Sequence, residues 1–299
     1  MKTDNLYRCG YVALIGRPNV GKSTLMNHIL RQKISITSRK PQTTRHRILG
    51  VKTTNTEQVI YVDTPGIHVS DRAMNRYMNK SASSILHDVD LILFLLDADK
   101  WTEEDDNVLV TLKNSTVPVI VLLNKIDKIQ NKESILPLID SLSKKMDYKE
   151  IIPISATKGI NVKALQKSIS QYLKVSEPYF PEDQITDKSE RFMSAEIVRE
   201  KLMRELGQEL PYDITVEIEK YEVKEKITKI AALIWVSRNS QKPIVIGKNG
   251  VRLKSIGQKA RIDIQKLIGS KVFLELWVKV KEGWADDDRA LKSLGYVDD

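Results

Sequence analysis

The sequence predicts two domains: an α/β domain with a doubly wound, mostly parallel sheet, and a smaller α+β domain after it. Two features along the 299 residues support this division. Continuously apolar runs alternate with amphipathic segments over residues 1–175, whereas strands of alternating polar and apolar residues follow after residue 190. Between them, residues 176–190 carry two prolines and many charged groups, which is typical of a linker. We therefore expect domains at 1–175 and 191–299, each of ordinary domain length.

The strands expected in the first domain are apolar on both faces, as in a parallel sheet that helices cover on both sides. They are residues 11–15, 59–62, 91–96, 118–123 and 151–154. Apolar residues within 135–142 follow the i, i+3, i+4, i+7 spacing of one helical face, and residues 162–173 form the last expected helix. Such alternation of strands and helices predicts a doubly wound sheet.

The second domain has a different order of elements. A helix is expected around residues 195–206, followed by strands near 214–218 and 229–236. A second helical pattern spans 253–267, and residues 272–280 alternate as a final strand. With a short helical segment before the glycine loop at 247–250, the order is α-β-β-α-α-β, which predicts a small sheet with its helices on one face.

Composition limits the function further. No apolar run approaches the ~20 residues that cross a bilayer, and the amino terminus does not resemble a signal peptide. Cys9 is the single cysteine, so an internal disulfide is impossible and we expect a cytoplasmic protein. The net charge is +9, and residues 238–271 carry nine basic residues but only one acid, Asp263. A concentrated basic stretch of this kind indicates nucleic-acid binding.

A phosphate-binding loop follows the first expected strand. The segment Gly16-Arg17-Pro18-Asn19-Val20-Gly21-Lys22-Ser23 matches GxxxxGK[ST] between a strand and a helix, the context that the motif requires. Backbone N–H groups there would surround phosphate oxygens, Lys22 would reach the β- and γ-phosphates, and the Ser23 hydroxyl would bind Mg²⁺. The expected nucleotide contacts from this segment are Gly16, Asn19, Val20, Gly21, Lys22, Ser23 and Thr24.

A second motif, Asp63-Thr64-Pro65-Gly66, follows the strand at 59–62. Asp63 would hold Mg²⁺ through water, and the Gly66 amide would contact the γ-phosphate. A threonine of the polar loop at 41–45 would complete the Mg²⁺ shell; Thr44 is favoured, with Thr43 as the alternative. The predicted metal ligands are therefore Ser23, Thr44 and Asp63, and the predicted catalytic residues are Lys22, Thr44, Gly66 and Asn19.

Two further motifs predict guanine specificity. In Asn124-Lys125-Ile126-Asp127, the Asp127 carboxylate would accept hydrogen bonds from guanine N1–H and N2–H₂, which adenine does not offer together. Asn124 would orient the loop and Lys125 would pack its stem on the ring. Ser155 and Ala156 end the last strand, where the Ala156 amide would face guanine O6. All these motifs follow strands, at the edge where α/β sheets bind ligands.

The segment Ile246-Gly247-Lys248-Asn249-Gly250 has the GxxG pattern inside the basic stretch. In the order α-β-β-α-α-β it predicts a KH domain of the bacterial type, in which paired glycines let a sugar-phosphate backbone approach two helix ends. A packing corner of the helix-turn-helix kind is the alternative. We expect Ile244 and Val245 to form the floor beneath the bases. The predicted RNA-binding residues are Ile244, Ile246, Gly247, Lys248, Asn249, Gly250, Arg252 and Lys254.

With these motifs in order, and with Arg191–Glu196 and Leu210–Tyr212, residues 8–285 resemble the Era family of bacterial ribosome-assembly GTPases. The resemblance implies a P-loop GTPase domain followed by a type II KH domain, and hydrolysis of GTP to GDP and phosphate with Mg²⁺ as cofactor. It also implies binding of a monomer to the 3′ end of the 16S rRNA during assembly of the 30S ribosomal subunit.

One departure from Ras-like enzymes affects the expected mechanism. Ile67 stands where those enzymes place a water-orienting glutamine, so hydrolysis must be organised in another way. Asn19 occupies the place where similar GTPases bind a monovalent cation, and we hypothesise that K⁺ stimulates this enzyme there. The alternative is that Asn19 only shapes the loop.

Other functions stay open at the level of the sequence. One is an RNA-binding scaffold with a hydrolytically idle GTP site, and another is a GTPase that serves tRNA modification. Basic residues around 163–174 also suggest weak peripheral association with the inner face of the cell membrane, although a solvated helix surface explains them equally well.

Overall fold

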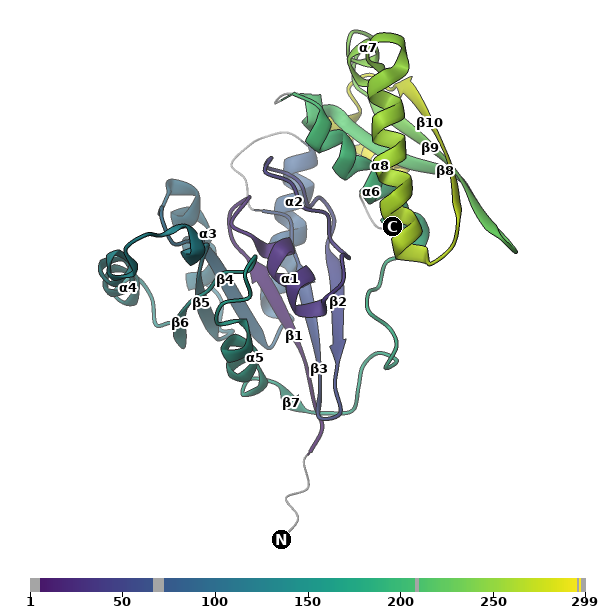
Figure 1. The fold of residues 1–299 in the computed structure, drawn as a ribbon. Coiled ribbons are helices and arrows are strands. Elements are labelled where there is room, and N and C mark those ends of the chain that lie inside the picture. The colour runs from purple at the N-terminus through teal and green to yellow at the C-terminus, as the bar shows by residue number, and fades with distance from the viewer. Residues whose placement is uncertain (1–5, 67–72, 208–209, 295, 297–299) are drawn as a thin grey trace. The chain divides into compact units, whose positions relative to one another are not determined.

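The computed structural model describes residues 6–66, 73–207, 210–294 and 296, which form two compact units (Figure 1). The first unit comprises residues 6–35, 44–66 and 78–187. The second comprises residues 36–43 and 73–77 together with the described residues from 188 onward. Both expected domains are present, but their boundaries differ: most of the expected linker belongs to the first unit, and two short segments from the amino-terminal half belong to the second.

Seven strands among the described residues form the sheet of the first unit, in the order β2-β3-β1-β4-β5-β6 with β7 beside β1. The pairs β2–β3 and β1–β7 are antiparallel and the others are parallel. Five strands confirm the apolar runs that the sequence predicts, although β6 is only partly buried, whereas β2 and β7 were not expected. The strands are β1 (Arg8–Ile15), β2 (Ile48–Thr53), β3 (Glu57–Asp63), β4 (Leu91–Asp97), β5 (Val119–Asn124), β6 (Glu150–Pro153) and β7 (Lys174–Val175).

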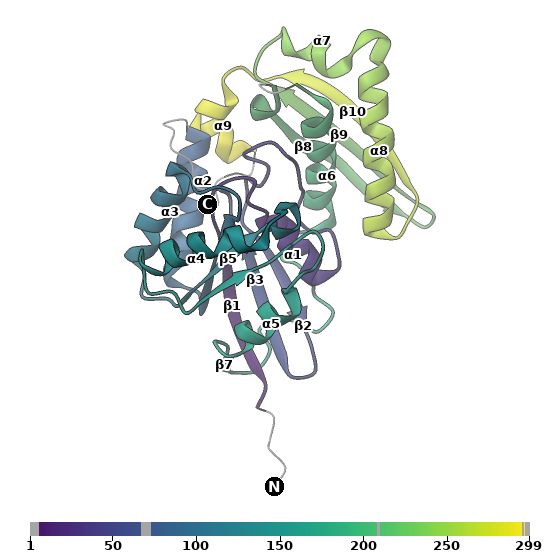
Figure 2. The ribbon, with the colours of Figure 1, turned by 60° about the vertical axis from the view of Figure 1, so that its left-hand side comes forward.

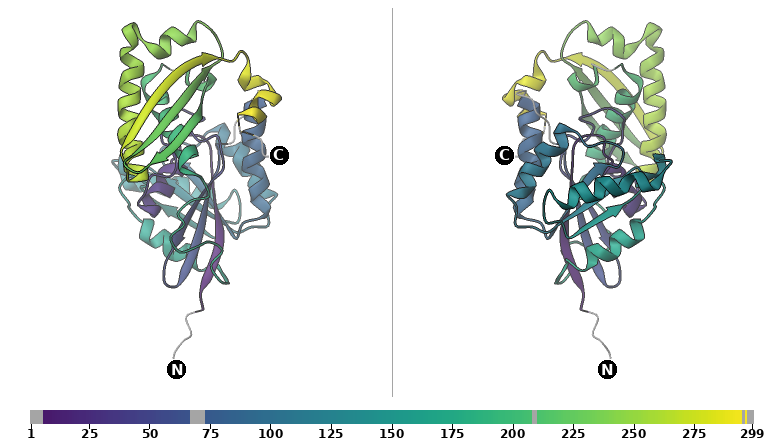
Figure 3. Two further views of the ribbon diagram at one scale, coloured as in Figure 1. Left: turned by 90° about the vertical axis from the view of Figure 1, so that its right-hand side faces the viewer. Right: turned by 90° about the vertical axis from the view of Figure 1, so that its left-hand side faces the viewer.

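Helices cover both faces of this sheet (Figures 2 and 3). On one face Val108 and Leu112 of α3 pack into a core with Phe94 of β4. Thr102 begins α3 with a capping box, since its backbone N–H donates to the Asp105 carboxylate (2.9 Å). The helices are α1 (Lys22–Leu30), α2 (Ala73–Ser83), α3 (Glu103–Lys113), α4 (Leu136–Ser143) and α5 (Val162–Ser170), with 3₁₀ turns at Ser84–His87, Ile126–Lys128 and Lys132–Ile135.

The expected linker is ordered by hydrogen bonds to the edge of the sheet. The Val51 N–H of β2 donates to the Ile185 carbonyl (2.8 Å). The buried Gln58 side chain of β3 donates to the Phe180 carbonyl (2.8 Å) and accepts from the Phe180 N–H (3.0 Å). Backbone groups make most of these contacts, so a polar, proline-containing sequence still folds against the strands.

The second unit confirms the α-β-β-α-α-β order, with three described strands arranged β10-β9-β8. Strands β8 and β9 are antiparallel and β9 and β10 are parallel. Buried residues of α6 and α8, including Val198, Leu202 and Ile256, pack with Ile230 and Ile234 of β9. The elements are α6 (Glu190–Glu205), β8 (Ile214–Lys224), β9 (Ile227–Val236), α7 (Gln241–Ile246), α8 (Val251–Ile268), β10 (Val272–Val280) and α9 (Asp288–Ser293), with 3₁₀ turns at Leu210–Asp213, Lys248–Gly250 and Trp284–Asp286.

In the described part of the chain, no helix combines the length and the apolar character that crossing a membrane requires.

Candidate nucleotide and RNA sites

The phosphate-binding loop connects β1 to α1 and depends on two glycines. A Cβ atom at Gly16 would lie 2.5 Å from the Leu95 carbonyl oxygen, and one at Gly21 would lie 2.3 Å from the Asn124 side-chain nitrogen. Asn19 also adopts the left-handed backbone conformation, at φ 62°. The loop therefore curves closely over the ends of β4 and β5, which directs its backbone toward a phosphate site.

Lys22 is held inside this loop. Its Nζ donates to the carbonyls of Gly16 (2.7 Å) and Arg17 (3.0 Å), and its side chain is almost completely buried. Burial lowers the pKa of Lys22 to about 8, although the nearby Asp63 carboxylate opposes this shift. A phosphate group at the loop would supply the negative charge that a buried ammonium lacks.

Three oxygen-bearing side chains meet at the carboxyl end of β3. Ser23 Oγ donates to Asp63 Oδ2 (2.6 Å) and lies 2.8 Å from Thr44 Oγ1. Thr43 Oγ1 instead donates to the Lys40 carbonyl (2.7 Å), so the geometry places Thr44 and not Thr43 beside Ser23. Sequence reasoning missed Ser35, whose hydroxyl also donates to Asp63 Oδ2 (2.8 Å).

These residues fit a divalent cation. Asp63 is fully buried, and its Oδ1 has no hydrogen-bond partner among the residues that the structure describes. Burial raises the pKa of Asp63, and the hydrogen bonds from Ser23 and Ser35 only partly oppose this shift. A hard cation with oxygen ligands, such as Mg²⁺, would neutralise the carboxylate and use the free oxygen.

Gly66 packs against the phosphate-binding loop, since a Cβ atom there would lie 2.8 Å from the Pro18 backbone nitrogen.

Ile67 stands where Ras-like enzymes have a water-orienting glutamine, and it lies outside the residues that the structure describes.

The base-binding residues form a connected set at the ends of β5 and β6. Asn124 donates to the Val20 carbonyl (2.7 Å) and accepts from the Ala156 N–H (2.9 Å), so it joins the phosphate-binding loop to the loop after β6. In the predicted contact, guanine O6 would therefore share the Ala156 N–H with the Asn124 side chain. Ser155 Oγ donates to Asp127 Oδ1 (2.6 Å) and so orients the carboxylate.

Asp97, at the end of β4, fixes Lys125 and was missing from the sequence prediction. Lys125 has a left-handed backbone, and its Nζ lies 2.7 Å from Asp97 Oδ2. Burial alone would raise the pKa of Asp97, but the hydrogen bond and charge of Lys125 outweigh burial and hold the pKa below its usual range. The ion pair orients the aliphatic part of the Lys125 side chain at the expected guanine-binding site.

The GxxG loop joins α7 to α8. Gly247, Asn249 and Gly250 all have positive φ, and a Cβ atom at Gly247 would lie 2.7 Å from the Arg252 Cβ. Nothing lies within 4 Å of a Cβ built on Gly250, so the space in front of that residue is open. Arg252 donates to the Ile244 carbonyl, which directs its guanidinium to the end of α7.

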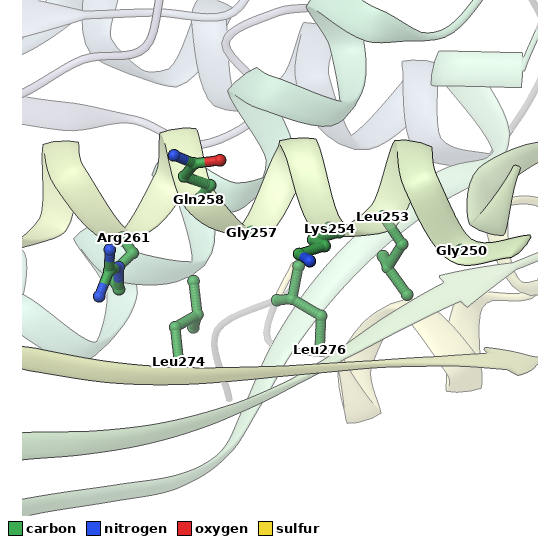
Figure 4. Close-up of a pocket in the computed structure, with 8 residues that line it drawn as sticks. All are labelled: Gly250, Leu253, Lys254, Gly257, Gln258, Arg261, Leu274 and Leu276. Carbon is green, nitrogen blue, oxygen red and sulfur yellow. The ribbon is translucent and has the colours of Figure 1, made fainter.

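A cavity of about 610 Å³ runs from this loop along α8 toward β10. Leu253 and Arg261 point from α8 toward β10, whose Leu274 and Leu276 point back (Figure 4). Apolar side chains thus form the floor of the cavity, which suits RNA bases. Lys254 and Arg261 also line it and suit the phosphates. Its lining residues are Gly250, Leu253, Lys254, Gly257, Gln258, Arg261, Leu274 and Leu276.

The cavity includes some, but not all, of the predicted RNA-binding residues. Val245, expected beneath the bases, is fully buried in the core of the second unit, and Ile244 does not line the cavity. Gly250 and Lys254 do line it, whereas Ile246, Gly247, Lys248, Asn249 and Arg252 do not. The alternation of residues 272–280 places Leu274 and Leu276 on one face of β10, but the gap beside α8 is visible only in three dimensions.

Comparison with known proteins agrees with this geometry. Residues 11–125 match the family model described as a 50S ribosome-binding GTPase, and residues 209–285 match a KH domain. The chain is 57% identical to GTPase Era of Marinobacter nauticus, covering 97% of this chain and 96% of that protein. It is 56% identical to GTPase Era of Pseudomonas aeruginosa, with the same coverage of both chains.

Two solved structures share the whole fold, each with a TM-score of 0.94 and 44% identity over 97% of this chain and 99% of the other. One is Era in complex with MgGDPNP and nucleotides 1506–1542 of 16S ribosomal RNA. The other is a single-residue variant of Aquifex aeolicus Era bound to GDP.AlF4⁻. Fold and motifs together define a P-loop GTPase with a carboxyl-terminal KH domain. The chain belongs to the Era family of GTPases.

Proposed function

We propose that this GTPase hydrolyses GTP to GDP and phosphate and binds single-stranded RNA at the 3′ end of 16S rRNA during assembly of the 30S subunit. The observation that carries the proposal is the combination, in one chain, of a guanine-nucleotide site with an apolar cavity flanked by Lys254 and Arg261 beside a GxxG loop. The complex of Era with 16S rRNA nucleotides supports the choice of RNA. An idle nucleotide site or a role on tRNA is less well supported, since neither accounts for both features.

Mg²⁺ would be held by Ser23, Thr44 and Asp63, and the MgGDPNP bound to Era supports that choice. When bound, it supplies charge neutralisation at the β- and γ-phosphates. Lys22 would then donate to the phosphates in place of the loop carbonyls, and the Gly66 N–H would face the γ-phosphate. Asp127, oriented by Ser155, selects guanine.

We further propose that K⁺ stimulates hydrolysis through Asn19, whose left-handed backbone lies in the phosphate-binding loop. A cation there would supply positive charge to the transition state without an arginine finger. Turnover is expected to be faster in KCl than in NaCl at equal ionic strength. Equal rates would leave Asn19 with a purely structural role.

The proposal places the chain in the cytoplasm as a monomer that associates with the 30S subunit. Weak peripheral association with the membrane, through the basic residues around 163–174, is a separate proposal. Co-sedimentation with anionic and neutral vesicles tests it, because only the anionic ones should retain the protein.

The RNA site is tested with two matched glycine substitutions. Gly250 and Gly269 flank α8, both have φ near 70°, and neither has an atom within 4 Å of a built Cβ. Only Gly250 lines the cavity. Gly250→Asp should weaken binding of a labelled 16S 3′-end oligonucleotide at least about tenfold in fluorescence anisotropy, because the carboxylate repels phosphates. Gly269→Asp should bind normally; equal binding by both variants would place the RNA elsewhere.

A further inference from the structure

A second cavity, of about 440 Å³, lies in the first unit and has no role in the function described above. Four segments enclose it: the end of α1, β2, the start of α5 and the chain around residues 182–185. Its volume is within the range of small-molecule sites. The lining residues are His28, Ile29, Leu30, Arg31, Val51, Lys52, Thr53, Gly159, Val162, Lys163, Gln166, Glu182, Gln184 and Ile185.

The cavity carries more positive charge than its surroundings neutralise. Arg31, Lys52 and Lys163 line it, against one acid, Glu182. In the part of the chain that the structure describes, none of these three cations forms an ion pair. Lys52 is half-buried; burial lowers its pKa, Glu57 opposes the shift, and Arg31 adds to it. An anionic ligand would offset both the cost of burying the Lys52 ammonium and its repulsion from Arg31.

The other residues that line the cavity are suited to the uncharged part of a small anionic ligand. Ile29, Val51 and Val162 give the cavity apolar walls, and Gln166 and Gln184 add amide groups that both donate and accept hydrogen bonds. The phosphate-binding loop, Asp63 and Asp127 take no part, so the cavity is separate from the GTP site. It is close to the loop after β6 that carries Ser155 and Ala156, however. Gly159 of that loop packs against His28, since a Cβ atom at Gly159 would lie 2.7 Å from His28 Nε2.

We propose that this cavity binds a second, small phosphorylated ligand of the nucleoside diphosphate class. Arg31, Lys52 and Lys163 bind its phosphates by charge-assisted hydrogen bonds, and the apolar walls receive its base. Enclosure by four segments favours a compact ligand over a continuous RNA strand.

The test is titration calorimetry of the full chain with its GTP site saturated by Mg²⁺ and GDP. ADP is the probe, because the guanine site discriminates against adenine, and inorganic pyrophosphate is the second probe, which separates recognition of the phosphates from recognition of the nucleoside. Saturable binding of one ADP per chain is expected, tighter than that of pyrophosphate. It should weaken at least tenfold in Lys52→Gln and in Arg31→Gln.

Lys167→Gln is the matched control, since Lys167 is exposed on α5 but does not line the cavity. Three outcomes would overturn the proposal. They are no saturable binding of ADP, ADP binding no tighter than that of pyrophosphate, and equal loss of affinity in Lys167→Gln. An octauridine whose binding weakens in Lys52→Gln, with neither ADP nor pyrophosphate bound, would replace the proposal with an RNA contact.

Discussion

At the scale of single residues, burial disfavours the charged form of the Asp63 carboxylate. It is fully buried, one carboxylate oxygen has no hydrogen-bond partner in the described part of the chain, and burial raises the pKa of the carboxyl group. Asp105 is equally buried, and its Oδ1 also has no hydrogen-bond partner among the described residues, but its Oδ2 lies 3.1 Å from Arg17 Nε, which neutralises the carboxylate. The two carboxylates therefore differ in a way that substitution can measure.

Asp63→Asn should stabilise the nucleotide-free protein by about 1 kcal/mol, because the neutral amide removes a buried charge that forms no close ion pair among the described residues, while it keeps an acceptor for Ser23. It should also abolish the extra stability that Mg²⁺ gives in the presence of GDP. Thermal unfolding with and without Mg²⁺ measures both effects. The control, Asp105→Asn, should destabilise the protein by leaving Arg17 unpaired; the same sign for both variants would contradict this assignment.

Asp127 determines base specificity in this account. Asp127→Asn should lower affinity for GDP at least about 100-fold, because two hydrogen bonds to a charged acceptor contribute about 1.5 kcal/mol or more each. Affinity for xanthosine diphosphate should rise, since the amide accepts from N1–H and donates to the carbonyl at C2. Competitive titration measures both, with the exposed Asp140→Asn as control. Unchanged preference for guanine would remove Asp127 from the base site.

At the scale of elements, α8 combines stability with RNA binding. Ile256, Ala260 and Ile264 form its buried stripe, while Lys254 and Arg261 line the cavity. Ile256→Ala should lower the free energy of unfolding of the second unit by about 2–5 kcal/mol, because it leaves a cavity in the core. Ile262→Ala, at an exposed position of the same helix, should change it by less than about 0.5 kcal/mol. Urea unfolding followed by circular dichroism distinguishes the two.

The sequence predicted elements well where burial dictates the residue pattern. The runs at 91–96 and 118–123 are apolar on both faces and appear as β4 and β5. Strand β2 was missed because its alternation is weak. It includes Gly50, where a Cβ atom would lie 2.6 Å from the Leu30 Cδ1. The segment 176–187 resembles a linker in sequence because its own backbone groups, which leave no residue pattern, make most of its hydrogen bonds to β2 and to the Gln58 side chain of β3.

The same distinction applies to the sites. Motifs located Lys22, Ser23, Asp63, Asn124 and Asp127, because phosphate and guanine chemistry demands those residue types at those places. Ser35 and Asp97 act through side chains that the fold brings near from other segments. The RNA cavity was only half predicted: the GxxG loop is a local pattern, whereas Leu274 and Leu276 come from a distant strand.

At the scale of the whole molecule, the chain itself links the two functions. Residues 36–43 belong to the second unit, where the Thr37 N–H donates to Glu200 of α6 (3.1 Å) and Arg199 donates to the Thr43 carbonyl. The next residue, Thr44, belongs to the first unit and lies beside Ser23. Ordering of this segment by Mg²⁺ and GTP is therefore expected to affect α6, and through it RNA binding.

The most direct test of this account measures GTP hydrolysis in KCl with and without the single-stranded 3′ end of 16S rRNA. Wild type and Gly269→Asp should hydrolyse GTP faster when the RNA is present. Gly250→Asp should retain its basal rate and lose the acceleration, which would join the nucleotide site and the RNA cavity in one mechanism. Rates that do not respond to RNA in any of the three proteins would contradict the coupling of the two sites.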